Sequence, residues 1–133
     1  MTYLNPFTVI KSTGNTTTDT LEASATFTGT GELNGYSQVL VYCISDTAGT
    51  LFFDWSNDGV TWYAFPTDGI AVSANIPKYW PAVKGGRYFR VRFVNSASEQ
   101  SSFDLTTYYG NDFVPSVSAL GISFNADDPA QRS

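Results

Sequence analysis

Histidine is absent from this chain of 133 residues, and cysteine occurs only once. Without histidine there can be neither a Ser-His-Asp triad nor a Cys-His nucleophile pair. A histidine metal cluster is excluded as well, and the single Cys43 builds neither a zinc site nor an internal disulfide. We therefore expect a protein that is not an enzyme and that uses no metal and no cofactor.

Charged residues are also scarce, at 14% of the chain against about 25% in an average soluble protein. The net charge of -5 argues against non-specific binding of nucleic acid. No apolar run approaches the roughly 18 residues of a membrane span. The N-terminus lacks the basic and apolar regions of a signal peptide. We expect a chain that is made in a cytoplasm and that binds neither nucleic acid nor membrane.

Aromatic residues, in contrast, are abundant, at 16% of the chain. Short runs rich in β-branched and aromatic residues alternate with turn signals between residues 19 and 113, at a spacing of about ten residues. This pattern predicts one all-β domain, an antiparallel β-sandwich of jelly-roll or immunoglobulin-like type with seven to eight strands. The expected strands cover residues 20–28, 36–45, 51–56, 61–65, 70–76, 78–83, 87–95 and 103–109.

The two ends of the chain have a different composition. Residues 1–18 combine a few apolar side chains with a polar run that lacks periodicity, so we expect an N-terminal arm ending in a loop, or simply a frayed terminus. Residues 114–133 are mostly polar but hold several apolar side chains between small residues. A disordered tail would not usually hold them, so part of this C-terminal tail is expected to pack, on this subunit or on a neighbour.

Two hairpins are expected. In the first, Asp58 and Gly59 suit a type I′ turn, which pairs Trp55 with Trp62 and places both rings in the core. The second joins residues 87–95 to residues 103–109. Its inward set is Phe89, Val91, Phe93, Phe103, Leu105 and Thr107, and its outward set includes Tyr88, Arg90, Arg92 and, near Arg92 or Val94, Asp104.

Two groups of side chains are candidates for binding. Tyr88, Arg90 and Arg92 form either a solvated strand face or a basic stripe that docks an acidic protein surface. Tyr79 and Trp80 lie between prolines, which restrict this segment to a sheet edge or a loop. These two rings are predicted to stack on a sugar or anchor an interface, unless Trp80 closes the core.

The segment from Asp54 to Phe65 resembles two known motifs only partially. It begins like a calcium loop, but Phe65 occupies the position of the required acid. It also resembles the sialidase Asp-box, but it is one residue short and occurs once. A turn explains the same residues, and no pair of converging carboxylates points to a glycosidase.

Three segments together resemble small β-sandwich modules of tailed-bacteriophage virions, as found in capsid decoration proteins, head fibres, baseplates and tail fibres. These are FDWSNDGVTW at residues 53–62, GRYFRVRFVN at 86–95 and QSSFDLTT at 100–107. The resemblance covers residues 50–108, and its motifs are mainly structural. With two adhesive ends and no second domain expected, the chain is more similar to a decoration (cement) protein than to a receptor-binding tip.

The resemblance implies a virion structural protein, assembled in the host cytoplasm. It would decorate and stabilise the capsid, as a homotrimer, by binding the major capsid protein or another virion protein across neighbouring subunits. The alternatives are a carbohydrate- or receptor-binding module of a tail or fibre, and a tail or connector component. The expected contact residues are Tyr3, Leu4, Phe7, Val9, Tyr88, Arg90, Arg92, Val117, Leu120, Ile122 and Phe124.

Overall fold

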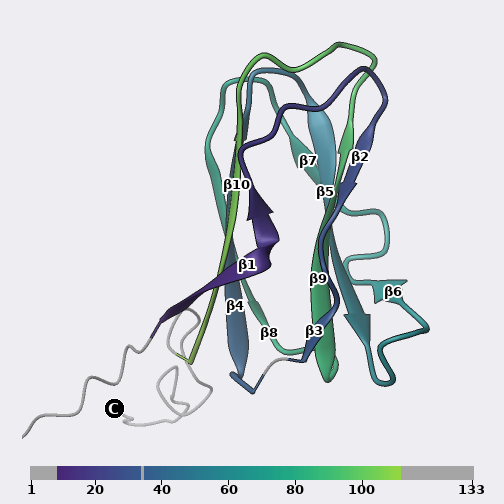
Figure 1. Cartoon of the computed structure of the whole chain (residues 1–133), viewed down its shortest axis with the longest axis vertical. Coiled ribbons are helices and arrows are strands. Elements are labelled where there is room, and N and C mark those ends of the chain that lie inside the picture. The colour runs from purple at the N-terminus through teal and green to yellow at the C-terminus, as the bar shows by residue number, and fades with distance from the viewer. Residues whose placement is uncertain (1–8, 34, 112–133) are drawn as a thin grey trace, which may run out of the picture.

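A computed structural model describes residues 9–33 and 35–111, and these residues form two antiparallel sheets packed face to face (Figure 1). Sheet A has the order β1-β10-β4-β8. Sheet B has the order β2-β9-β5-β6, with β3 also paired to β9 and β7 to β5. The strands are β1 Ile10–Thr17, β2 Thr26–Thr28, β3 Glu32–Leu33, β4 Gln38–Ser45, β5 Gly49–Ser56, β6 Tyr63–Ala64, β7 Ile70–Val72, β8 Lys78–Val83, β9 Tyr88–Asn95 and β10 Phe103–Gly110.

This architecture confirms the predicted all-β sandwich, although it has ten strands where seven to eight were expected. The described part of the chain contains no helix, and therefore none long enough to cross a membrane.

The core lies between the two sheets and follows from alternation along each strand. On β9, Phe89, Val91 and Phe93 are fully buried, while the residues between them are only partly covered. Each large apolar side chain taken out of water contributes about 1.5–3 kcal/mol. The buried apolar set is Val39, Val41, Cys43, Leu51, Phe53, Trp55, Ile70, Val72, Phe89, Val91, Phe93, Phe103, Leu105 and Tyr109.

The polar run expected as the end of an N-terminal arm is instead strand β1, so the prediction of a loop there is wrong. β1 pairs with β10, with Ile10 opposite Tyr109. The run folds inward because its polar groups have partners: the Oδ1 of the fully buried Asn15 accepts the Val91 N–H at 2.8 Å, and its Nδ2 donates to the Thr30 carbonyl at 2.9 Å. Hydrophobic periodicity does not detect a strand whose buried side chains are polar.

The expected strand over residues 20–28 is also mostly wrong, because only Thr26–Thr28 forms a strand. The preceding residues turn: Ser24 has a φ of 60° and donates its N–H to the Ser96 carbonyl, and the Ala25 N–H bonds to the Glu22 carbonyl. These bonds satisfy the backbone without a strand ladder, so they replace the pairing that the alternation suggested.

The first hairpin is shifted by one residue from its predicted register, since Trp55 lies opposite Tyr63 rather than Trp62. Only Gly59 has a positive φ in this loop, so it is not a type I′ turn. The Asp58 carboxylate accepts the N–H groups of residues 60 and 61 at 2.9 and 2.8 Å, which holds a wider loop. Trp62 is therefore half-buried outside the core, contrary to the prediction.

The second predicted hairpin does not exist, because β9 belongs to sheet B and β10 to sheet A. Residues 96–102 carry the chain from one sheet to the other. Side-chain bonds hold this crossing: the Asn95 Oδ1 accepts the Thr47 hydroxyl at 2.6 Å, and the Gln100 Nε2 donates to the Ser45 Oγ at 2.9 Å. Asp104 consequently lies opposite Ile44 on sheet A and not near Arg92 or Val94.

Candidate interaction surfaces

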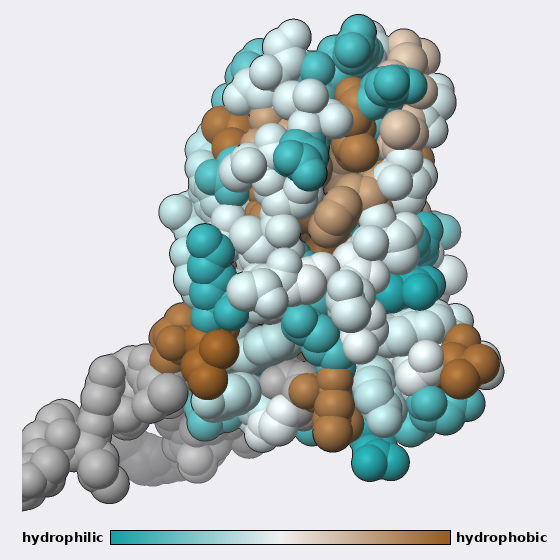
Figure 2. Space-filling view, viewed as in Figure 1, coloured by the Kyte–Doolittle hydropathy of each residue, from teal (hydrophilic) through white to brown (hydrophobic). Residues whose placement is uncertain are grey.

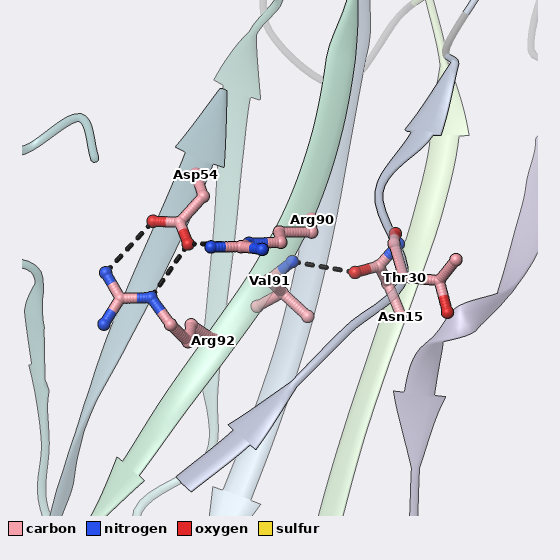
Figure 3. Close-up of polar contacts among 6 residues, drawn as sticks. All are labelled: Asn15, Thr30, Asp54, Arg90, Val91 and Arg92. Atoms are coloured by element: carbon pink, nitrogen blue, oxygen red, sulfur yellow. Dashed lines mark hydrogen bonds and ion pairs between the residues drawn. The ribbon is translucent and has the colours of Figure 1, made fainter. Parts of the chain in front are cut away.

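The outer face of sheet B holds an ion triad at its centre. Asp54 is only 2% exposed, and its Oδ2 accepts the Nε of Arg90 at 3.0 Å and of Arg92 at 2.8 Å. A second bond joins the Arg92 Nη2 to the Asp54 Oδ1 at 3.1 Å. Figure 3 shows both guanidinium groups converging on this carboxylate from β9. The hydrogen bonds to Asp54 raise the pKa of Arg92.

The same two arginines lie over aromatic rings. The Arg90 guanidinium is 4.4 Å from the Trp62 ring centre, and that of Arg92 is 4.2 Å from the ring centre of Phe52. Such cation–π contacts cover apolar surface with charged groups. The structure thus brings Arg90 and Arg92 together with Tyr88 on one outward strand face, where Asp54 compensates one positive charge. Their part in docking a partner stays a prediction.

An apolar cleft of about 390 Å³ opens beside edge strand β8. It lies where β8 of sheet A faces β5 and the loop after β6 of sheet B. Every lining residue is apolar: Phe53, Trp55, Phe65, Pro66, Trp80, Pro81, Ala82 and Val83. Phe65 is 72% exposed and Trp80 is 36% exposed, so the cleft remains open to solvent rather than plugged.

Tyr79 and Trp80 point to opposite sides of β8. Trp80 lies opposite the buried Val41 and faces the cleft, whereas Tyr79 lies opposite Tyr42 on the outside, with the two tyrosine ring centres 4.7 Å apart. The two residues therefore do not form a single stacking platform. The predicted sheet-edge position of this segment is confirmed.

Several polar residues that the sequence did not single out join the two sheets at the edge of the sandwich opposite the cleft. Glu32 of β3 accepts the Ser12 and Tyr109 hydroxyls, both at 2.6 Å, and the Asn15 Nδ2 at 3.0 Å. Burial raises the Glu32 pKa, but these hydrogen bonds and one from the Gly14 N–H outweigh it, so the pKa is lowered. No sequence pattern marked these residues, because Ser12 and Asn15 belong to a polar run without apolar periodicity.

Figure 2 shows the side of the molecule that carries β1, where hydrophobic groups occur as separate spots among hydrophilic ones. The apolar cleft and β8 belong to other parts of the surface. Among the expected contact residues, Val9 is 47% exposed. Tyr3, Leu4, Phe7, Val117, Leu120, Ile122 and Phe124 lie outside the described residues, as does the expected C-terminal tail.

The loop that resembles a calcium site uses its acid internally. The Asp58 carboxylate accepts two backbone N–H groups and the Ser56 hydroxyl, and these bonds lower the Asp58 pKa to about 2. Among residues 9–33 and 35–111, no three His, Cys, Asp or Glu side chains gather in a way that would hold a metal ion. The loop is therefore explained as a structural turn.

Comparisons with solved structures found chains that are similar to this one. The crystal structure of PBSX exported protein XepA matches with a TM-score of 0.66 and 25% identity, over 89% of this chain and 43% of XepA. The chain thus spans less than half the length of XepA. A protein of the disulfide-linked pili that form Bacillus endospore appendages matches with a TM-score of 0.46 and 15% identity, over 84% of this chain and 98% of that one.

No curated protein matches the sequence. The model of one family, described as the uncharacterised protein YqxG N-terminal domain, matches residues 5–110. That match includes all ten strands of the sandwich. The chain therefore belongs to the YqxG N-terminal domain family.

Proposed function

We propose that this chain is a structural, adhesive domain of a phage-related particle and that it acts by binding another protein of that particle. The likeness to XepA, a phage-related exported protein, supports the phage connection, as does the resemblance to virion modules. The observation that carries the adhesive role is the open apolar cleft beside Trp80. Exposed apolar surface of this kind is typical of sites that bind other proteins.

In its specific form, the proposal is that the domain decorates a capsid. A domain that binds across neighbouring capsid subunits, and binds only the assembled shell, stabilises that shell by mass action. No catalytic step is needed, and the function is non-enzymatic. The contact would seat bulky apolar side chains of the capsid protein in the cleft, because no polar side chain lines it.

Cosedimentation of the purified chain with phage-related particles from the organism that encodes it tests this proposal. We expect the purified chain to sediment with tail-free heads. Phe65→Lys, at a 72% exposed position in the cleft, should lower the bound fraction at least about tenfold. Val60→Lys, at a 79% exposed position outside the cleft, is the matched control and should bind normally.

A wild-type chain that stays in the supernatant would overturn the particle role, and binding to tails alone would replace the capsid version with a tail component. Deleting residues 1–8 tests the predicted arm without touching β1. A longer deletion would also remove Ser12, whose hydroxyl bonds to Glu32.

A second candidate function is carbohydrate or receptor binding, which the exposure of Tyr79 (65%) and Trp80 (36%) favours. Sugar sites combine an aromatic surface with polar groups that orient the hydroxyls, and the cleft lining offers no polar side chain. A glycan array would separate the two candidates. Binding that is lost in Trp80→Ala would favour the sugar, whereas an array without any hit would remove this candidate.

A further inference from the structure

The outer face of sheet A is an apolar surface that no other described element covers. Alternation along β4, β8 and β10 places its side chains outward, opposite the core set. Its apolar and aromatic members are Leu40, Tyr42, Ile44, Tyr79, Pro81, Val83 and Tyr108. Tyr79 and Val83 are 65% and 62% exposed. A large contiguous apolar surface exposed on a folded domain marks an interaction site.

The edge of this sheet does not favour the addition of another strand. The Lys84 N–H donates to the Ser37 carbonyl at 2.8 Å, which makes these two residues a hydrogen-bonded pair. Hydrogen-bonded and non-hydrogen-bonded pairs alternate along an antiparallel ladder, so residues 79, 81 and 83 direct their backbone N–H and C=O groups away from β4. Residue 81 is a proline and has no N–H to donate. Proline at this position protects an edge strand from pairing. A partner is therefore expected to pack on the face rather than extend the sheet.

The charges that border this face are complementary to one another. Lys11, beside Tyr108, lies toward one end of the strands, and Asp104, beside Ile44, lies toward the other. The whole chain carries a net charge of -5, so two copies repel each other unless they meet through a surface without net charge. A face with one charge of each sign meets that condition.

We propose that a second copy of this chain packs on the outer face of sheet A, sheet against sheet, around a two-fold axis. The oligomer would then be a dimer in place of the homotrimer that the resemblance to virion modules implies. The axis follows the row of Thr106, Tyr42 and Tyr79, which crosses the middle of the face. A half-turn about this row places each end of the face over the opposite end of the same face on the second copy. Both copies then use the same surface, as an isologous interface requires. The proposal does not depend on the role in a phage-related particle.

This rotation makes the contacts complementary. Ile44 meets Leu40 of the second copy, and Tyr42 meets Tyr42. Asp104 is then offset sideways by one strand, about 4.8 Å, from Lys11 of the second copy, across a spacing of about 10 Å between the two sheets. Both side chains point into this space, and together they are long enough to bridge it. Each dimer therefore gains two such ion pairs at the border of an apolar contact, where charge pairing sets the register.

Light scattering coupled to size-exclusion chromatography tests the proposal on the full chain. We expect the wild type to have twice the mass of one chain. Ile44→Lys should shift it to the monomer and raise the dissociation constant at least about a hundredfold. Val94→Lys is the matched control, because Val94 is a half-buried, outward-facing β-branched residue on sheet B, and it should leave the dimer intact. A monomeric or trimeric wild type, or a dimer that Ile44→Lys does not weaken, would overturn the proposal.

Charge reversal provides a second test that leaves the apolar side chains in place. Lys11→Asp and Asp104→Lys should each weaken the dimer by about tenfold, because each places like charges opposite one another. The double variant should restore the wild-type dissociation constant. Circular dichroism checks that every variant is folded. Single variants without effect, or a double variant weaker than both, would overturn the two-fold arrangement.

Discussion

The outer faces of both sheets carry aromatic side chains, but the neighbours of these side chains differ. On sheet B, the rings of Phe52 and Trp62 lie beneath the guanidinium groups of Arg92 and Arg90, which Asp54 holds in place. On sheet A, Tyr42 has Thr106 and Tyr79 as its cross-strand neighbours, and neither is charged.

The difference teaches that an outward aromatic residue is available to a partner only if its cross-strand neighbours leave it uncovered. Arg92 lies directly opposite Phe52, and Arg90 directly opposite Asp54. The arginine-rich strand, which the sequence offered as a docking stripe, therefore also covers the rings of its own sheet. Three experiments test this contrast.

The largest effect is expected from Asp54→Asn. Removal of the carboxylate leaves two guanidinium groups without their partner, at side chains that are only 25% and 28% exposed. We expect a loss of about 2–3 kcal/mol in the free energy of unfolding, below the range for fully buried pairs because the arginines retain some hydration. Asp104→Asn, an outward carboxylate on sheet A, should cost less than about 1 kcal/mol when both losses are measured in the monomeric Ile44→Lys background. Urea unfolding at one protein concentration measures both, and equal losses would refute the contrast.

A smaller effect is expected from removing a covered ring. Trp62→Ala deletes the cation–π contact with Arg90 and the apolar area beneath it, which should cost about 1–2 kcal/mol. Compared in the monomeric Ile44→Lys background, Tyr79→Ala removes an exposed ring that contacts Tyr42 and should cost at most about 1 kcal/mol. If the tyrosine variant proved the less stable of the two, the outer face of sheet A would be the better-packed surface.

The smallest effect is expected when acid protonates Asp58, in the loop that positions Trp62. Backbone N–H groups of Thr61 and Val60 and the Ser56 hydroxyl lower the Asp58 pKa from 3.8 to about 2. The ionised carboxylate therefore stabilises the folded loop fully above pH 3.8, and this contribution is lost as the pH falls toward 2. Tryptophan fluorescence should report a loop transition over this interval in the wild type. Asp58→Asn should lack it, whereas a transition that persists in Asp58→Asn would assign it to another carboxyl group.

The sequence predicted those parts of the fold in which apolar side chains decide the structure. Alternation on β9 identified Phe89, Val91 and Phe93 as core, and all three are fully buried. It failed for β1, where the inward residues include Ser12 and Asn15 and bury because of hydrogen bonds that only the folded chain provides.

The candidate surfaces were predictable only in part, because they depend on pairing between distant strands. The exposure of Trp80 agrees with its position between prolines. The sequence could not show that Trp80 and Tyr79 face opposite sides, since this depends on which strand β8 joins. Likewise, Asp54 lies 36 and 38 residues before its two arginines, and no local sequence pattern indicates contact between residues so far apart.

The pairing of β1 with β10 also determines when the domain can fold. Sheet A joins a strand from the start of the described chain to one from its end, with Ile10 opposite Tyr109, and β10 also separates β1 from β4. Such non-local pairing is typical of domains that fold in milliseconds to seconds rather than microseconds. At about 5–20 residues per second, a ribosome needs on the order of several seconds to proceed from β4 to β10. During that interval one edge of β4 has no strand to pair with, and the nascent chain is most exposed to aggregation and proteolysis.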